Sequence, residues 1–453
     1  MSDTLRREST ATATMEPGLR QTISISRGLA LAVSMVVGSG LLGLPGLALA
    51  ESPAAASAGW IFSVAAVAPL IYVFARLGLR YTSAAGLSRY AQEAVGSWAG
   101  HAVTAVLCGT FTVGIPALAL IGAAYLQRLL GFSESSIGWL AIAILTAVTL
   151  TNIIGVRLTS LINTVSLVVL IGMVVLLVVS NLPAAETGIE RFGETLGGNI
   201  GVSYTAVWGV CALLFWAFLG WENLSFGLEE FKNPRWSIPL VYWLSFGVVS
   251  VLYLALGIIS VGAVLLGRSV DGPAGVATLA GDGWFGSALI AIMILVILAN
   301  ANAWVFGASR LIYSAGAQRI LPEALGRLSH NGIPRVSLVF LLITYTILIL
   351  LISVSGTSVS TPILVVSQNF LVLYVFSIVA FWRSERGARR WIVTPICALS
   401  CAFLLSGFTW WIAYPLGLII VGYIAARRRS TEPHKALNTT TTAEEDNSCT
   451  QGN

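Results

Sequence analysis

Long apolar stretches separated by short polar turns occupy nearly the whole chain. A helix needs about 20 apolar residues to cross the roughly 30 Å of hydrocarbon in a bilayer. Stretches of this kind lie at approximately residues 27–50, 57–77, 98–127, 136–155, 160–181, 203–230, 237–264, 284–313, 336–354, 360–382, 391–408 and 409–426. The pattern predicts an all-α membrane protein with 12 transmembrane helices, of which the last two have the least distinct boundary.

Composition agrees with this pattern. The chain of 453 residues is 56% hydrophobic and 10% charged, with a mean hydropathy of +0.85, whereas soluble domains carry about 25% charged residues. Lipid must therefore surround most of the surface. The polar ends, residues 1–20 and 430–453, are expected to be disordered, with one membrane domain at residues 21–429 between them. The first apolar run is too long for a cleavable signal peptide, and none is expected.

Positive charges indicate the orientation. If both termini are cytoplasmic, every one of the 25 Lys and Arg residues except Arg128, Arg191 and Arg268 lies on the cytoplasmic side. This is the bias that the positive-inside rule describes. We therefore predict a multi-pass plasma-membrane protein with both termini inside. The net charge of +5 is spread over short loops and indicates no nucleic-acid partner.

Two of the apolar stretches contain residues that disfavour a continuous helix. Residues 35–46, "MVVGSGLLGLPG", contain four glycines and a proline, which are the weakest helix formers. Residues 215–226, "FWAFLGWENLSF", contain Gly220 and the acidic Glu222 at membrane depth. The two stretches are five helices apart, and an odd number of helices reverses the direction of the chain. We predict an inverted repeat of five plus five helices with discontinuous helices 1 and 6, followed by two further helices.

The first break has a chemical use. Unpaired backbone groups in a membrane are tolerated only where they line a cavity, and the N-terminus of a half-helix favours an anion. Gly38, Ser39 and Gly40 could therefore bind the carboxylate of an amino acid, while carbonyls of the second break bind its ammonium group. The alternative is that these small residues only permit close helix packing. The matching break in helix 6 favours a binding site.

Glu222 is the most distinctive single residue. An ionisable side chain within a span is costly and is by default a functional candidate. Burial disfavours the carboxylate relative to the neutral acid, so Glu222 could take up and release a proton near neutral pH. The alternative is that Glu222 merely caps an open helix end.

The side-chain pocket is expected to be apolar. Pro116 should kink its span, and Phe218 and Leu219 lie beside the second break. Trp216 could form a thin gate there or serve as ordinary core. Neither a second acid nor a buried arginine accompanies these residues, so a neutral, apolar amino acid fits best.

The remaining polar residues favour no other chemistry. Neutral ones within the spans are interpreted mainly as interhelical hydrogen-bonding groups, and these are Thr110, Thr112, Asn300, Asn302, Gln368 and Asn369. The five cysteines are interpreted as small buried apolar side chains. His101, His330 and His434 lack metal-ligand spacing. We expect no metal and no cofactor.

Several segments resemble a known transporter family. "GSG" in the first stretch, "FWAFLGWE" in the sixth, the following "EEFKNPRWSIP", "RYTSAAGLSRYAQEAVG" and "GAQRILPEALGRLSHNGIPR" occur in the order found in the amino acid–polyamine–organocation superfamily. The resemblance covers about residues 27–426. "VGIPALALIGAAY" together with "EEFKNP" most resembles bacterial exporters of methionine and branched-chain amino acids.

The resemblance implies roles for individual residues. The "GSG" segment matches the family's carboxylate site, and Glu222 matches an acid linked to gating and proton sensing. Trp216 matches an aromatic residue that closes over substrate. The remaining matches, which are residues that line the pocket, are Leu219, Trp304 and Asn369.

Together these observations predict a secondary transporter that exports neutral, hydrophobic amino acids across a bacterial inner membrane. Uptake by proton symport remains an alternative, because the same site serves both directions. The stretch at 160–181 lacks the lysine that replaces a sodium ion in some proton-driven relatives, so the coupling ion stays open. A membrane-embedded enzyme or receptor is disfavoured, since Glu222 has no paired acid or histidine. The oligomeric state is not predicted.

Overall fold

The computed structural model describes residues 23–81, 86–154, 157–199, 201–329, 332–408 and 410–431. The side chains of residues 157–166, 223, 226, 227, 229 and 429–431 are not part of this description. The predicted disordered ends are residues 1–20 and 430–453. Residues 1–20 and 432–453 lie outside the described residues, as do His330, His434 and Cys449.

Over these residues the chain is built from helices. Their bounds are α1 Ile25–Val36, α2 Ser39–Glu51, η1 Pro53–Ala55, α3 Ala56–Arg80, α4 Gly86–Val95, α5 Ser97–Leu130, η2 Glu134–Ser136, α6 Ile137–Ile154, α7 Arg157–Ser180, α8 Leu182–Leu196, α9 Tyr204–Leu214, η3 Phe215–Phe218, α10 Trp221–Leu224, η4 Ser225–Glu230, α11 Pro234–Leu265, η5 Gly275–Ala280, α12 Gly283–Ala317, η6 Glu323–Gly326, α13 Arg335–Ser355, α14 Ser360–Ser384, α15 Ala388–Leu405, η7 Trp410–Ile412 and α16 Ala413–Thr431, where η marks a short 3-10 helix. The predicted all-α class is confirmed.

The predicted spans appear in their predicted order. Among the described residues, nine helical segments are individually long and apolar enough to cross a membrane. The pair α1 and α2 forms one further span with a bend of 42°. Leu167–Ser180 of α7 and Leu182–Leu196 of α8 meet the same test only as a pair, with a bend of 90° between them. The run from α9 to η4 lies at the position of the predicted sixth span, where Tyr204–Phe218 forms a shorter apolar helix. By length and composition the described residues therefore contain nine to eleven spans, against the 12 predicted.

The outer surface of the helices is apolar. Side chains such as Ile154, Val354 and Leu399 are 83%, 88% and 71% exposed, and each belongs to a spanning helix. Water would make such exposure unfavourable over so large an area, whereas lipid does not. The exposed faces are therefore the surfaces that contact the bilayer.

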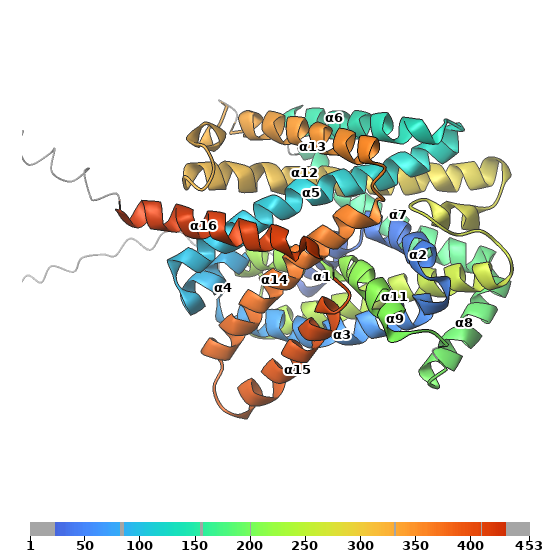
Figure 1. The fold of residues 1–453 in the computed structure, drawn as a ribbon, viewed down its shortest axis with the longest axis horizontal. Coiled ribbons are helices and arrows are strands. Elements are labelled where there is room, and N and C mark those ends of the chain that lie inside the picture. Colours follow the sequence, from blue (N-terminus) through green and yellow to red (C-terminus); the bar gives the residue numbers. More distant parts are fainter. Residues whose placement is uncertain are drawn as a thin grey trace, which may run out of the picture.

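The spans pack in two groups (Figure 1). In one group, α11 of the seventh span packs on α1 and α3 of the first and second spans, and α3 packs on α9 of the sixth. α5, α6, α12 and α13, from the third, fourth, eighth and ninth spans, share a second hydrophobic core. Each group combines two spans of the first half with the two at equivalent places in the second half. This is the arrangement that the predicted five-plus-five repeat requires.

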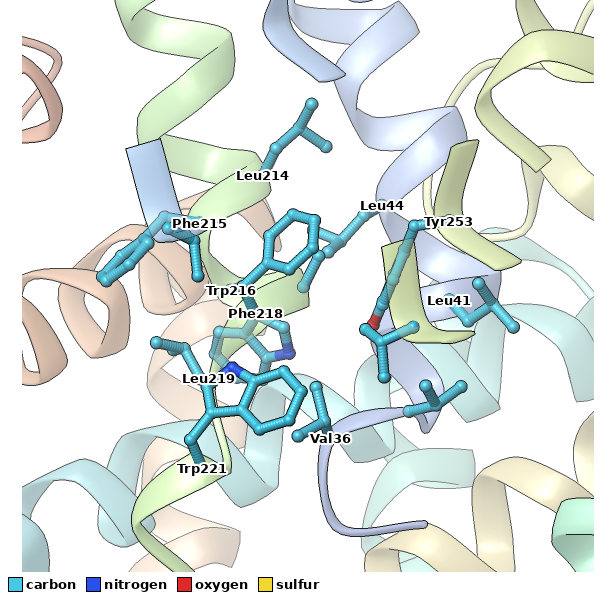
Figure 2. Packing of buried hydrophobic residues seen from close by; sticks show 14 of the residues in the cluster. Val36, Leu41, Leu44, Leu214, Phe215, Trp216, Phe218, Leu219, Trp221 and Tyr253 are labelled. Atoms are coloured by element: carbon cyan, nitrogen blue, oxygen red, sulfur yellow. The ribbon is translucent and has the colours of Figure 1, made fainter. Parts of the chain in front are cut away.

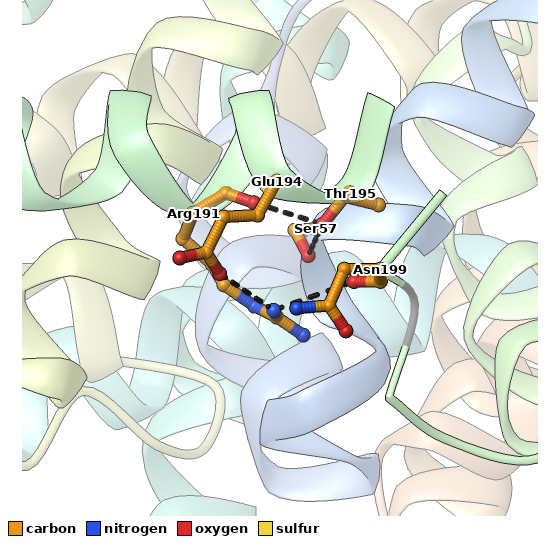
Figure 3. A network of polar contacts seen from close by, with 5 residues as sticks. All are labelled: Ser57, Arg191, Glu194, Thr195 and Asn199. Atoms are coloured by element: carbon orange, nitrogen blue, oxygen red, sulfur yellow. Dashed lines mark hydrogen bonds and ion pairs between the residues drawn. The ribbon is translucent and has the colours of Figure 1, made fainter. Parts of the chain in front are cut away.

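Two helices were not predicted from the apolar pattern. One is α4, and the other is α8, which is anchored through polar groups (Figure 3). The Thr195 and Ser57 hydroxyls lie 2.9 Å apart and join α8 to α3. Arg191 Nη1 donates to Glu194 Oε2 at 3.1 Å and to the Asn199 carbonyl at 3.4 Å.

The described cysteines support their interpretation as apolar side chains. Cys108, Cys211, Cys397 and Cys401 are buried and unpaired.

Candidate substrate site

The first span is interrupted between α1 and α2. α1 ends at Val36 and α2 begins at Ser39. Between them Val37 is extended, with φ −87° and ψ 121°, and Gly38 is not helical, with φ −158° and ψ −135°. The interruption places the first N–H groups of α2, and with them the positive end of its dipole, inside the protein. The predicted discontinuity of helix 1 is confirmed.

A side chain from the eighth span supports this break. Asn300 Oδ1 on α12 accepts hydrogen bonds from the Ser39 N–H at 3.2 Å and from the Ser39 hydroxyl at 3.3 Å. A β-carbon on Gly38 would overlap the Asn300 amide. Gly38 therefore permits close packing at the same point where the helix opens. The interpretation of Asn300 as an interhelical hydrogen-bonding residue is confirmed.

Gly40 brings two further spans close to the break. A β-carbon on Gly40 would lie 3.0 Å from Tyr253 Oη of α11 and 3.1 Å from Trp216 Cδ1 of η3. Because glycine has no side chain, the tyrosine hydroxyl and the indole both reach the backbone of α2 here. The seventh and sixth spans thus meet the first span at one place.

The sixth span is interrupted at the same depth. η3 ends at Phe218, Leu219 is extended, and α10 begins at Trp221. Gly220 between them has φ +118°, a conformation that other residues adopt only with strain. A β-carbon on Gly220 would lie 2.7 Å from the Met35 carbonyl oxygen in α1. The predicted discontinuity of helix 6 is confirmed, and the two breaks lie against each other.

Glu222 lies at the start of α10 and is 1% exposed. Its Oε2 accepts a hydrogen bond from the Gly220 N–H at 3.1 Å, so Glu222 does cap the open end. Its Oε1 is buried without a hydrogen bond from any described residue. Capping therefore uses only one of the two carboxylate oxygens. It is compatible with the predicted role of Glu222 in proton coupling.

Two tyrosine hydroxyls donate hydrogen bonds to carbonyl groups that have no helical partner at this break. Tyr374 of α14 donates to the Phe218 carbonyl at 3.4 Å, and Tyr242 of α11 donates to the Trp221 carbonyl at 3.3 Å. Tyr374 also lies near the Glu222 carboxylate. Both sides of the break are thus supported by neighbouring helices.

A stacked pair of tryptophans occupies the space beside the breaks. The rings of Trp216 and Trp304 lie 6.1 Å apart at an angle of 3°, and Phe111 meets Trp304 edge-on at 5.3 Å. A β-carbon on Gly114 of α5 would lie 3.5 Å from both indoles. Figure 2 shows Trp216 among Phe218, Leu219 and Tyr253. The two indoles therefore pack directly beside α5 and the second break.

The other predicted pocket residues lie at different distances from the pair. Pro116 is buried in α5, but two residues turn a helix by about 200°, so Gly114 rather than Pro116 faces the indoles. Asn369 donates from Nδ2 to Thr110 Oγ1 at 3.1 Å, and its Oδ1 has no hydrogen bond from a described residue. Thr110 precedes Gly114 by one helical turn, which places Asn369 close to the pair.

Phe218 and Leu219 are both buried at the second break. Phe218 is fully buried and packs its ring against Tyr253 at 5.6 Å and Phe246 at 6.2 Å. Leu219 is 2% exposed. Phe218 therefore connects the break to α11.

The groups around the first break are mostly neutral. A cavity next to it is lined by side chains of which only Ser34 and Asn300 are polar.

Among the described residues no group of three or more His, Cys, Asp or Glu side chains could bind a metal ion. Asn302 accepts hydrogen bonds at Oδ1 from Thr151 and Asn152, both at 2.8 Å, which confirms its interpretation as an interhelical hydrogen-bonding residue.

Three residues of this region escaped the sequence analysis. Gly114 and Tyr253 lie in uniformly apolar stretches, and Tyr374 lies among other aromatic residues. No local pattern marks any of them, because their importance comes only from the helices that they face.

Comparison with known proteins identifies the family to which this chain belongs. A family model for amino acid permeases matches residues 23–437. An uncharacterized amino acid permease of Bacillus subtilis, YecA, is 25% identical over 93% of this chain and 99% of its own length. The L-methionine/branched-chain amino acid exporter YjeH of Escherichia coli is 25% identical over 93% of this chain and 100% of its own. The cadaverine/lysine antiporter of Escherichia coli is also 25% identical, over 89% and 95%.

The family match includes both breaks and every residue of the candidate site. The chain therefore belongs to the amino acid permease family, within the amino acid–polyamine–organocation superfamily, and is a multi-pass membrane protein.

Proposed function

We propose that this protein is a secondary transporter that exports neutral, hydrophobic amino acids, namely methionine, leucine, isoleucine and valine. The observation that carries the proposal is the contact between the two broken spans, where Gly220 packs against Met35 one turn before Gly38. The protein would be a carrier rather than an enzyme, driven by the proton or electrochemical gradient across a bacterial inner membrane.

Complementary backbone groups support a zwitterionic substrate. The first break ends in the N–H groups of α2 around Ser39 and Gly40, which attract a carboxylate. The second break releases carbonyl groups between Phe218 and Trp221, which attract an ammonium group. An amino acid lying across the two breaks would satisfy both sets at once.

The surrounding side chains support a neutral, apolar substrate. Trp216, Trp304 and Phe111 supply aromatic surface, and Val366 lies near the same point of α5. Among the described side chains, Glu222 is the only charged one that is buried. A cationic substrate, such as those in the name of the lysine antiporter, would require further acidic groups. We therefore favour the substrates in the name of the methionine exporter.

Glu222 gives the second break a way to respond to protons. An ionised carboxylate accepts a stronger hydrogen bond from the Gly220 N–H than a neutral acid does. Protonation would weaken this bond and loosen the segment that carries Trp216. Departure of Trp216 from Trp304 would then open the pocket, with Leu219 and Asn369 contacting the substrate and Pro116 shaping α5 behind it.

The proposed orientation has both termini in the cytoplasm. Arg268, which is expected outside, donates to Asn181 Oδ1 and to the Thr278 carbonyl, both at 2.6 Å. These partners lie in the loops after α7 and before α12, which share one side of the membrane in the predicted topology. A phosphatase reporter at the carboxyl end, active only outside the cytoplasm, should be inactive.

The transport proposal is tested with purified protein in proteoliposomes. Liposomes loaded with unlabelled methionine should take up labelled methionine by exchange. Leucine, isoleucine and valine should compete, and lysine, cadaverine and glutamate should not. Absence of exchange with all four hydrophobic amino acids would refute the proposal.

The direction is tested in cells loaded with methionine-containing dipeptides. Expression of an exporter lowers intracellular methionine, whereas expression of a proton symporter does not. The second result would replace export with uptake and leave the site unchanged.

A further inference from the structure

Tyr253 of α11 has a buried hydroxyl that the fold itself does not use. The side chain is 0% exposed, and its Oη has no hydrogen bond from any described residue. A buried hydroxyl without a partner is unfavourable. Tyr242, on the same helix, does find a carbonyl partner. The missing partner of Tyr253 is therefore a local property of its surroundings.

Two aromatic side chains pack against the ring that carries this hydroxyl. Trp60 of α3 lies 5.5 Å from the Tyr253 ring, and Phe218 of η3 lies 5.6 Å from it. Figure 2 shows the oxygen pointing into the cluster around Trp216 rather than away from it. Because the ring is fully buried among these neighbours, the hydroxyl has little freedom to reach another partner.

The hydroxyl is directed at the first break. A β-carbon on Gly40 would lie 3.0 Å from Tyr253 Oη and 3.4 Å from Trp216 Nε1. Two polar groups, a phenol O–H and an indole N–H, thus converge on the backbone at the start of α2. Both groups can donate, and so can the N–H groups at this helix end. The Ser39 N–H has an acceptor in Asn300 Oδ1, whereas the Tyr253 hydroxyl has none among the described residues.

We propose that Tyr253 binds the substrate carboxylate through its hydroxyl, beside the N–H groups of α2. This inference rests on the proposed function and names one more group of the same site. A carboxylate only accepts hydrogen bonds, and it would provide the acceptor that Tyr253 lacks. Trp216 lies against Gly40 in this structure, so its movement would admit the carboxylate to the hydroxyl.

The test compares Tyr253→Phe with Tyr345→Phe. Tyr345 of α13 is also 0% exposed with an unpartnered hydroxyl, but it lies in the second group of helices. Each variant loses one hydroxyl and keeps its ring. In proteoliposomes, Tyr253→Phe should raise the KM for methionine about tenfold, as expected for a lost hydrogen bond to a charged group, while Tyr345→Phe keeps the wild-type KM.

A second measurement separates carboxylate binding from a structural effect. Methioninol has the side chain and amine of methionine but no carboxylate, and its inhibition constant against methionine exchange should be equal in wild type and Tyr253→Phe. The inference is overturned if the methionine KM is unchanged in Tyr253→Phe, or if methionine and methioninol weaken by the same factor. Failure of the wild type to exchange any amino acid would instead overturn the proposed function.

Discussion

The two broken spans differ in how the backbone groups at the break are supported. The break in the first span is supported by one side chain from a distant helix, Asn300, and presents N–H donors. The break in the sixth span is supported by a glycine with φ +118°, by its own Glu222 and by tyrosines from two helices, and presents carbonyl acceptors. One side of the site is therefore adjustable, and the other is defined by backbone.

This difference indicates which break changes shape during transport. Support for the first break comes from a side chain, and a rotation of Asn300 that breaks its two hydrogen bonds would release Ser39. Gly220, in contrast, lies against the Met35 carbonyl, so the sixth span must move together with α1 or separate from it. Charge on Glu222 is the one feature of the second break that can change without such a movement.

The largest effect is expected for Gly220→Ala. The new β-carbon would combine a disfavoured φ of +118° with a separation of 2.7 Å from the Met35 oxygen, and strain of this kind costs about 1–3 kcal/mol before the overlap is counted. Methionine exchange should fall more than about tenfold, with a lower melting temperature. Gly307→Ala, in open space on α12, is the control. Wild-type behaviour of Gly220→Ala would show that the second break is not defined by backbone.

Gly38→Ala should be less damaging, and it should be suppressible. Its β-carbon would meet the Asn300 side chain rather than backbone. Exchange should fall several-fold, and Asn300→Ala in the same chain should restore part of it, since the overlap is removed while only the hydrogen bonds to Ser39 are lost. A double-mutant cycle measured by exchange rate checks this. Strictly additive losses would contradict the difference between the two breaks.

Glu222→Gln should act on pH dependence more than on the amount of folded protein. Glutamine keeps the acceptor for the Gly220 N–H but is always neutral, as a protonated glutamic acid is. Wild-type exchange should change several-fold between mildly acidic and mildly alkaline buffer, and the variant should show a flat profile. Glu323→Gln, at a residue whose side chain is 68% exposed, should retain the wild-type profile. Equal pH dependence in all three proteins would remove Glu222 from proton coupling.

The smallest effects are expected for Tyr242→Phe and Tyr374→Phe. Each removes one long hydrogen bond to a carbonyl of the second break, at 3.3 and 3.4 Å, which is worth about 1 kcal/mol. The melting temperature in detergent should fall by a few degrees in each variant and by about the sum in the double variant. Unchanged stability in both would mean that the released carbonyls do not need these hydroxyls.

Much of the architecture could be read from single segments. Lipid requires a run of apolar residues for each span, and this requirement is local, so the order of the spans and the breaks at Gly38 and Gly220 were predicted. α4 and α8 were missed, because amphipathic helices outside the hydrocarbon do not need such a run. Pro116 was predicted as a pocket residue because proline kinks a helix. In the structure, Gly114 is the residue of α5 that faces the indoles.

The sequence by itself determined that this is an all-α membrane protein with two interrupted spans and one acid at membrane depth. It did so because hydrophobicity, glycine and charge act on the segment that contains them. Tertiary structure alone decided that Asn300 caps α2, that Trp216 stacks on Trp304 and that the Tyr253 hydroxyl reaches Gly40. These contacts join spans far apart in the chain, and they depend on how each helix is rotated about its axis, which neighbouring residues do not encode.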